Sequence, residues 1–409
     1  MNFIQIHRIK IWEPLQQTLV LMLVGLVIML AGCTSAPQRS TVAAPSAFDS
    51  SPWATPSATM RWNEYACDLI TSNKSGQQGS VRVLAYLNLA MHNAIVVAAQ
   101  QGRKSDGATA GAAAAFLAYY FPNDATAIAA RLSGETAALG SGSTRDDFAA
   151  GAQIGQTAAA DVVAAAKTDR FDLAWTGTVP TGAGKWASSG QPARPPIFPR
   201  LGEMRPFFLS SGSELRPPPP PALDSAEFKL ALAELRSISD HRSIDQLRIA
   251  QYWENLTPPY VGGAWNDVAR GAISAHGLTD AEASRVLALV HIAQVDAFIA
   301  CHDGKYVYWL ARPTMVDPGI RLAIVLPNHP SYPANHGCVS TASGVVLDAV
   351  FPDQGGRYTA MSRQAAESRV YGGIHYRFDI DAGMEIGRKS AALALANLPK
   401  DRVYLPVMR

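Results

Sequence analysis

The last third of the chain carries side chains that suit the binding of an oxyanion. Arginine forks match tetrahedral oxyanions, and a lysine adds a compact positive charge. A histidine held by a carboxylate can act as a nucleophile or as a ligand, and a second histidine opposite it can act as a general acid. These residue types occur at Lys305, Arg312, His336, Arg369, His375 and Asp379.

The first two cations lie in the apolar stretch GKYVYWLARP, residues 304–313. If the stretch is helical, seven residues make almost two turns, so Lys305 and Arg312 point to the same side. Two cations on one face repel each other, and we therefore expect an anion between them. A solvated basic face is the alternative interpretation.

Two later motifs can bring histidines to the same point. In HPSYPANHG, turn residues precede an apolar run, so a loop delivers His336 to the start of a helix, whose N–H groups add donors for an anion. In SRVYGGIHYRFD, two glycines break the helix and let Arg369 and His375 turn toward one site. Asp379, four residues after His375, can then accept a hydrogen bond from the imidazole.

Helices must position these clusters. After residue 60, apolar residues recur at helical spacing, and no alternating strand run of useful length occurs. Residues 172–224 break this pattern with several prolines, so we expect a long wrapping loop that Phe207 and Phe208 anchor to the body. The sequence thus predicts an all-α helical bundle with a Pro-rich loop region. The expected helices cover 80–99, 107–121, 123–139, 144–167, 225–238, 243–255 and 279–313.

The front of the chain has the pattern of an export signal. A short basic region precedes the apolar run TLVLMLVGLVIML, residues 18–30, which is too short to span a membrane comfortably. The run ends in LAGC, which resembles the bacterial lipoprotein signal and implies cleavage before Cys33 and lipid on its sulfur. An uncleaved anchor helix is the alternative. Because Thr34 follows the cysteine, the resemblance implies an outer membrane lipoprotein that faces the periplasm.

These features divide the chain into three parts. Residues 1–32 are the expected signal peptide, and 33–60 form a tether rich in Ser, Thr, Ala and Pro. Residues 61–409 form a single helical domain. Within it, 61–224 hold the N-terminal helices and the Pro-rich loop, and 225–409 hold the oxyanion site.

Net charge and cysteine content limit which partners and which disulfides we expect. The 409 residues carry a net charge of only +2, without a basic tract interleaved with aromatic residues, so no nucleic acid is expected as a partner. Besides Cys33, the chain has Cys67, Cys301 and Cys338. In an oxidising periplasm at most one disulfide can join two of them. Three small buried thiols are the alternative.

The order of the three motifs resembles a known superfamily. Lysine, six residues and Arg-Pro come first, then a Pro-x-x-His turn, then Ser-Arg, five residues, histidine, three residues and aspartate. This order resembles the type-2 phosphatidic acid phosphatase and vanadium haloperoxidase superfamily. Upstream stretches such as LNLAMHNAIVVAA and QLRIAQYWEN look like its soluble haloperoxidase-like branch. The resemblance covers most of the chain after the tether.

The resemblance implies roles for the cations. Lys305, Arg312 and Arg369 would bind the equatorial oxygens of vanadate, and phosphate could occupy the same site. Asp296, on the preceding helix, would support one of the arginines. Vanadate is therefore the cofactor that the resemblance implies.

The resemblance also implies roles for the histidines. His375 would be the axial partner, bonding to vanadium or attacking phosphorus, and Asp379 would orient it. His336 would be the acid–base residue on the opposite side. Bromide-oxidising members often carry a histidine seven residues before the motif histidine, as His329 stands to His336, so His329 is a candidate halide contact.

One motif departs from the family's pattern. Where the family usually has Pro-Ser-Gly-His, this chain has Pro333-Ala334-Asn335-His336. Ala334 cannot donate the hydrogen bond that the serine gives to an oxyanion oxygen, and such a loss typically costs about 2–4 kcal/mol of transition-state stabilisation. Asn335 has an amide donor that can substitute for it; the alternative is that Asn335 crowds the site, since glycine usually lies there.

Three functions follow as hypotheses. The favoured one is a haloperoxidase, in which bound vanadate activates peroxide to oxidise halide. The second is a phosphatase that hydrolyses phosphomonoesters or lipid phosphates through a phosphohistidine. The third is a non-catalytic lipoprotein with a degenerate pocket, which Ala334 and Asn335 favour. The expected partners are peroxide and halide or a phosphate ester, a membrane through the lipid, and a second copy of the chain in a homodimer.

Overall fold

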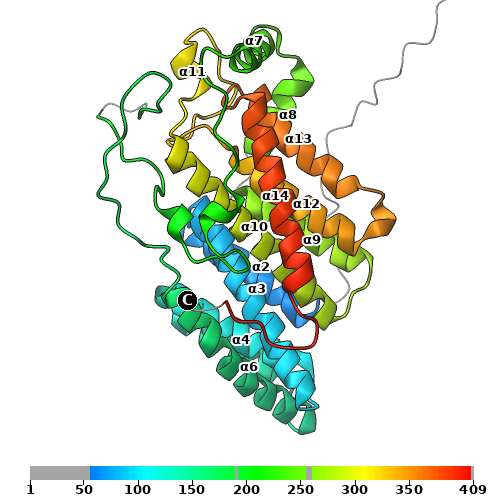
Figure 1. The fold of residues 1–409 in the computed structure, drawn as a ribbon. Helices are drawn as coiled ribbons and strands as arrows, with labels where there is room; N and C mark the ends of the chain where they lie inside the picture. The colour runs from blue at the N-terminus through cyan, green and yellow to red at the C-terminus, as the bar shows by residue number, and fades with distance from the viewer. Residues whose placement is uncertain (1–55, 189–191, 255–259, 407–409) are drawn as a thin grey trace, which may run out of the picture. The chain divides into compact units, whose positions relative to one another are not determined.

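A computed structural model of the chain describes residues 56–188, 192–254 and 260–406 (Figure 1). These residues form thirteen α-helices, labelled α2 to α14. The described part contains no β-strand and only an isolated bridge between Lys185 and Leu310. The predicted all-α fold is therefore confirmed. The predicted signal peptide, Cys33 and most of the tether lie outside the described residues.

The N-terminal half of the bundle begins at Ala58, three residues before the predicted domain boundary. Helices α4 and α6 pack closely because small residues line their contact. A β-carbon on Gly111 would lie 2.0 Å from the carbonyl oxygen of Ala152, and one on Gly155 would lie 2.0 Å from that of Ala108. The helices of this half are α2 (Ala58–Ser72), α3 (Gln77–Gln100), α4 (Ser105–Tyr120), α5 (Ala125–Ala138) and α6 (Ser143–Lys167).

Helix α10 (Asp280–Tyr308) runs through the centre of the fold. Thr279 caps its start in a capping box with Glu282. It contacts α3 and also α12 (Asn335–Val350) and α14 (Arg377–Asn397), so it joins the two halves (Figure 1). By length and composition, α3 and α10 could each cross a membrane, but 94% of each apolar window is buried in the fold, as in a core helix.

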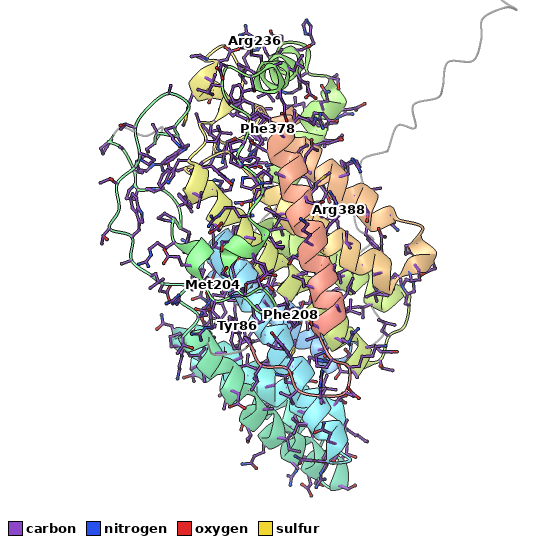
Figure 2. All side chains as sticks on the ribbon, viewed as in Figure 1. Tyr86, Met204, Phe208, Arg236, Phe378 and Arg388 are labelled. Carbon is purple, nitrogen blue, oxygen red and sulfur yellow. The ribbon has the colours of Figure 1, made fainter. Side chains whose placement is uncertain are left out.

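The C-terminal half carries the predicted site. A β-carbon on Gly383 would lie 2.5 Å from the carbonyl oxygen of Ala334, so α14 can lie close against the first turn of α12. Phe378 marks the first turn of α14, and Arg388 lies on a later turn (Figure 2). The other helices of this half are α7 (Ala226–His241), α8 (Ile244–Glu254), α9 (Tyr260–Ala275), α11 (Pro313–Val316) and α13 (Arg357–Tyr371).

The long irregular segment between α6 and α7 wraps around the bundle, as its prolines predict (Figure 1). Phe207 is buried, which agrees with its predicted anchoring role. Asp296 of α10 was expected to support an arginine, and this expectation is wrong. Its buried carboxylate instead accepts hydrogen bonds from the backbone N–H groups of Phe207, at 2.7 Å, and Phe208, at 2.8 Å. Asp296 therefore fastens the wrapping segment to the core.

The stretch 304–313 is not one helix. Helix α10 ends at Tyr308, because Trp309 takes a left-handed backbone conformation with φ 54° and ψ 38°. Arg312 then caps α11, which starts at Pro313. The prediction that Lys305 and Arg312 share one helical face is therefore wrong, and the two cations reach the site from different elements.

The three cysteines in the described part of the chain are free thiols. Cys301 and Cys338 are buried, and Cys67 is partly buried. Burial raises the pKa of Cys67 to about 12, so this thiol stays protonated and unreactive. The structure thus agrees with the alternative of three small thiols rather than with a disulfide.

Replacing Asp296 with alanine should destabilise the fold. The N–H groups of Phe207 and Phe208 would lose their acceptor, and each buried unsatisfied donor costs about 1–3 kcal/mol. We expect the free energy of unfolding to fall by about 2–5 kcal/mol in urea denaturation. Asp296→Asn keeps one carbonyl acceptor and should lose less. An alanine variant as stable as the wild type would show that aromatic packing alone holds the segment.

Candidate oxyanion site

A cavity of about 290 Å³ lies where α3, α8, α12 and α13 come together with the loops before α12 and α14. The predicted site residues that line it are His329, Asn335, His336, Arg369 and His375. The other predicted residues lie behind this wall and hydrogen-bond to its loops; they are Lys305, Arg312 and Asp379. The structure thus gathers all eight around one place.

Gly373 brings His375 to the cavity. Helix α13 ends at Tyr371, and Gly373 has φ +82°, a left-handed conformation that glycine adopts without steric cost. Helix α14 starts at Arg377, so His375 precedes it and lies one turn before Asp379. The predicted break between the two helices is confirmed.

His375 lies between Asp379 and Arg312. Its Nδ1 donates to Oδ2 of Asp379 at 2.8 Å, as the four-residue spacing predicts. Because a carboxylate only accepts, Nδ1 carries the proton and Nε2 keeps its lone pair. Nε2 lies 3.0 Å from Nη1 of Arg312. Burial, together with the nearby cations, lowers the pKa of His375 well below its usual range, so the neutral ring can serve as a ligand or a nucleophile.

Ser331 is a site residue that the sequence analysis missed. Its hydroxyl donates to Oδ2 of Asp379 at 2.5 Å and lies 3.4 Å from Nδ1 of His375. Burial raises the pKa of Asp379 to about 6, and the hydrogen bond from Ser331 opposes this rise. Ser331 therefore helps to keep Asp379 ionised as the partner of His375.

Arg312 is completely buried, and among the described residues no carboxylate forms an ion pair with it. Its Nε donates to the carbonyl oxygen of His329 at 2.9 Å, and its Nη1 donates to that of Ile374 at 2.8 Å. Burial lowers the pKa of Arg312, because the charged form loses its hydration. A buried cation that only neutral groups contact favours the approach of an anion.

Lys305 is also completely buried and contacts backbone rather than acids. Its ammonium donates to the carbonyl oxygens of Pro330, at 3.1 Å, Ser331, at 2.9 Å, and Pro333. These bonds use all three of its N–H groups. Burial lowers the pKa of Lys305 to about 8. Lys305 thus organises the loop before α12, and its charge acts on the cavity from behind that loop.

Arg369 reaches the cavity from the last turn of α13 and is almost fully buried. Its Nη1 pairs with Oε2 of Glu254 at 2.7 Å. Its Nε donates to the hydroxyl of Ser368 at 2.9 Å, and its Nη2 donates to the carbonyl oxygen of Ala250 at 3.1 Å. Glu254 also lines the cavity, and the sequence analysis did not identify it as a site residue.

His336 lies in the first turn of α12, as predicted. Ala334 is the N-cap of this helix and gives no side-chain cap, so the first-turn N–H groups lack acceptors within the helix. Nε2 of His336 donates to the carbonyl oxygen of Trp253 at 3.1 Å, which leaves the lone pair on Nδ1. Burial, with Arg369 as a further cause, lowers the pKa of His336 well below its usual range, so its ring is neutral.

Asn335 lines the cavity beside His336. Its Oδ1 accepts a hydrogen bond from the thiol of Cys301 at 3.0 Å, so its NH₂ group is the part of the amide that can serve the cavity. This contact fits the expectation that Asn335 donates where Ala334 cannot. That the amide of Asn335 replaces the hydroxyl donor missing at Ala334 stays a prediction.

His329 lies in the cavity wall and contacts the guanidinium of Arg312, with Nδ1 3.0 Å from Nη2. Burial, reinforced by Lys305 and Arg312, lowers the pKa of His329 well below its usual range. Nδ1 also lies 3.1 Å from the carbonyl oxygen of Pro330. Its predicted contact with halide stays a prediction.

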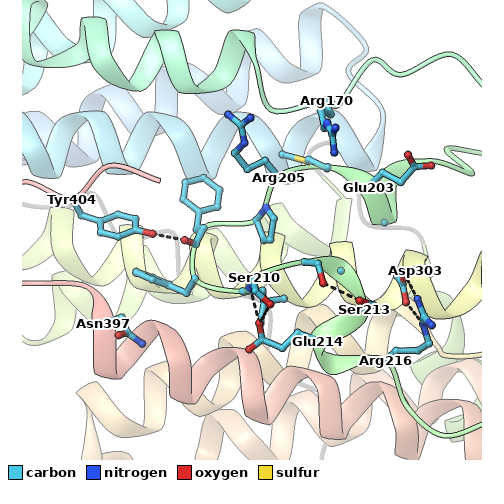
Figure 3. A pocket seen from close by; sticks show the side chains of 18 residues that line it. Arg170, Glu203, Arg205, Ser210, Ser213, Glu214, Arg216, Asp303, Asn397 and Tyr404 are labelled. Carbon is cyan, nitrogen blue, oxygen red and sulfur yellow. Dashed lines mark hydrogen bonds and ion pairs between the residues drawn. The ribbon is translucent and has the colours of Figure 1, made fainter. Parts of the chain in front are cut away.

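A larger cavity, of about 650 Å³, lies away from this site, beside the segment that follows α6 (Figure 3). None of the eight predicted residues lines it. Two of its carboxylates have partners in its own wall, as Arg216 pairs with Asp303 at 2.6 Å and Ser210 donates to Glu214 at 2.6 Å. Cavity size therefore does not locate the candidate site, whereas the convergence of cations and histidines does.

Oxyanion binding should be lost at low pH, and replacing Ser331 with alanine should make this loss begin at a higher pH. Asp379 must be ionised to hold His375, so we expect wild-type binding to weaken as the pH falls through about 6, the pKa of Asp379. Loss of a hydrogen bond worth about 1.5 kcal/mol to the carboxylate should move this limit upward by about one unit. Calorimetric titration with inorganic phosphate at several pH values measures the limit.

Ser331→Thr serves as the control for this prediction, because it keeps the hydroxyl and should keep the wild-type limit. An unchanged limit in Ser331→Ala would mean that the serine has no influence on the ionisation of Asp379.

Comparisons with known proteins agree with this geometry. A family model described as the VCPO second helical-bundle domain matches residues 356–400, the part that contains Arg369, His375 and Asp379. No curated protein matches the chain.

Solved structures share the fold. A bacterial vanadium-dependent iodoperoxidase is similar with a TM-score of 0.69 and 23% identity, over 84% of this chain and 96% of that one. The holo form of a bacterial vanadium-dependent chloroperoxidase gives a TM-score of 0.61 and 14% identity, over 78% and 92% of the two chains. An apo form of a bacterial vanadium-dependent chloroperoxidase gives a TM-score of 0.62 and 15% identity, over 77% of this chain and 92% of that one. The chain therefore has the fold of the vanadium haloperoxidases, and the family model matches the helices that carry Arg369, His375 and Asp379.

Proposed function

We propose that the protein is a vanadium-dependent haloperoxidase, which uses hydrogen peroxide to oxidise a halide. The observation that carries this proposal is a pair of fully buried cations, Lys305 and Arg312, with no carboxylate pairing with them among the described residues. Arg312 lies beside the neutral Nε2 of His375, and Lys305 holds the loop before α12. Burying such charges is unfavourable unless an anion joins them, so the arrangement serves oxyanion binding better than it serves stability.

The donors at the cavity fit vanadate, or phosphate of the same shape. Among the described residues no group of three His, Cys, Asp or Glu side chains could hold a bare metal ion, whereas the site offers an oxyanion many N–H groups. Arg369, the amide of Asn335 and the first-turn N–H groups of α12 would donate to its oxygens, and Nε2 of His375 would bind it. Bound vanadate would supply a Lewis acid that activates hydrogen peroxide toward attack by halide.

His336 is the residue best placed to move a proton in this reaction. Its Nε2 is committed to the carbonyl oxygen of Trp253, so the base is Nδ1. An anion in the cavity would counter the effect of Arg369 and raise the pKa of His336. The ring could then take a proton from entering peroxide and release it as water forms. His329, in the same wall, would contact the halide.

The solved structures of the same fold support the haloperoxidase reading, because they are an iodoperoxidase and chloroperoxidases that depend on vanadium. A phosphatase is the second candidate, and one observation favours it. Asp379 holds the proton of His375 on Nδ1, so Nε2 is left without a proton, as a nucleophile at phosphorus needs. His336 would then protonate the leaving oxygen.

Purified protein should brominate a phenolic dye only when vanadate and peroxide are both present. His375→Gln should lower turnover at least about 100-fold, because the imidazole that would hold the oxyanion is lost. Asn335→Gly should lower it by up to about tenfold, the effect of one neutral hydrogen bond. Hydrolysis of an aryl phosphate, measured in parallel on vanadate-free protein, tests the second candidate.

Arg388→Gln is the control for these variants, because Arg388 is exposed on a distant turn of α14 and pairs with Glu385. Hydrolysis without bromination would replace the first candidate by the second. Absence of both activities, together with absence of phosphate binding, would contradict both and favour a non-catalytic lipoprotein.

We also propose that Cys33 carries lipid and tethers the protein to the periplasmic face of the outer membrane. The motif LAGC after an apolar run supports this proposal. Mass spectrometry of the native protein should show that residues 1–32 are absent and that the new N-terminus carries acyl chains. Cys33→Ser should abolish the modification. A native protein with Met1 intact would contradict the proposal.

A further inference from the structure

Glu254 places a carboxylate in the wall of a cavity that otherwise suits an anion. It is the last residue of α8, and its side chain is 25% exposed. It lines the cavity together with His336 and His375. A negative charge at this point offsets the charge of the buried Arg369, but it also opposes the binding of any anion.

Glu254 is not needed to hold Arg369 in place. The guanidinium also donates from Nε to the hydroxyl of Ser368 at 2.9 Å and from Nη2 to the carbonyl oxygen of Ala250 at 3.1 Å. These two neutral acceptors fix the plane of the group. A guanidinium has five N–H bonds, so two remain for an oxyanion after the three contacts are made.

Only one oxygen of Glu254 is committed to Arg369. Oε2 accepts from Nη1 at 2.7 Å, whereas Oε1 has no hydrogen-bond partner among the described residues. An ionised carboxylate accepts hydrogen bonds and cannot donate them. Oε1 can therefore bond only to a ligand atom that brings a hydrogen, and it repels a bare anionic oxygen.

We propose that Glu254 makes the site selective for oxyanions that carry a proton, such as vanadate and phosphate, over sulfate. This inference rests on the oxyanion site of the proposed function. At neutral pH phosphate and vanadate retain O–H groups, and such a group can form a charge-assisted hydrogen bond to Oε1. Sulfate has no proton to offer, so its oxygens would face the carboxylate without a hydrogen bond. Selectivity then comes from repulsion of the wrong ligand.

Calorimetric titration of vanadate-free protein with inorganic phosphate and with sulfate, at neutral pH, tests this proposal. Wild-type protein should prefer phosphate by at least about tenfold, or about 1.4 kcal/mol. In Glu254→Gln the amide can donate as well as accept. Sulfate should then bind at least about tenfold more tightly than it binds wild type, while phosphate changes less. Vanadate, measured by competition with phosphate, should follow phosphate.

Two control variants make the outcome specific. Glu254→Asp keeps the carboxylate and should keep the preference for phosphate. Glu385 forms a similar pair with Arg388, at 2.6 Å, on the exposed side of α14. Glu385→Gln removes this pair and should change the affinity for neither phosphate nor sulfate. A Glu254→Gln protein with the wild-type preference would overturn the proposal and leave Glu254 as an anchor of Arg369. Wild-type protein that binds neither phosphate nor vanadate would overturn the oxyanion site itself.

Discussion

The burial of Lys305 and Arg312 is the constraint on which the site depends. Neither cation has a carboxylate partner among the described residues, so backbone carbonyl groups must replace the water that each has lost. Those carbonyls belong to the loop before α12 and to Ile374, next to His375. Satisfying the cations therefore also fixes the two loops that carry the histidines. Lys305 does so from the end of α10, whose long helix packs against both halves of the fold.

The same cations determine the protonation of the histidines. Burial comes first, but the positive charges of Arg312 and Arg369 add to it in lowering the pKa values of His375 and His336. A neutral imidazole offers a lone pair, and the hydrogen bonds to Asp379 and to the carbonyl of Trp253 decide which nitrogen offers it. An entering anion weakens the influence of the cations. Oxyanion binding and the proton affinity of the opposite histidine are thus coupled through the shared charge.

Much of this arrangement follows from the sequence, because helical periodicity and motif spacing are local properties. The all-α fold, the break at Gly373 and the bond between His375 and Asp379 are of this kind. The end of α10 was missed because Trp309 takes a left-handed conformation that is uncommon for a bulky residue. Asp296 was misassigned because its partners are backbone N–H groups, which every non-proline residue has. Ser331 and Glu254 act on partners 48 and 115 residues away, so no local pattern marks them.

Asp379 and Glu254 show that position, not charge, decides what an acid does in an oxyanion site. Both are carboxylates that contact a residue of the cavity wall. Asp379 is fully buried behind His375, so it meets the ligand only through the imidazole that it orients. Glu254 lies in the wall itself and keeps one oxygen available to the ligand. The first acid can strengthen binding of every oxyanion by holding the histidine, whereas the second discriminates among oxyanions by the protons they carry. A count of charges around the cavity would treat the two as equal, and only their placement separates affinity from selectivity.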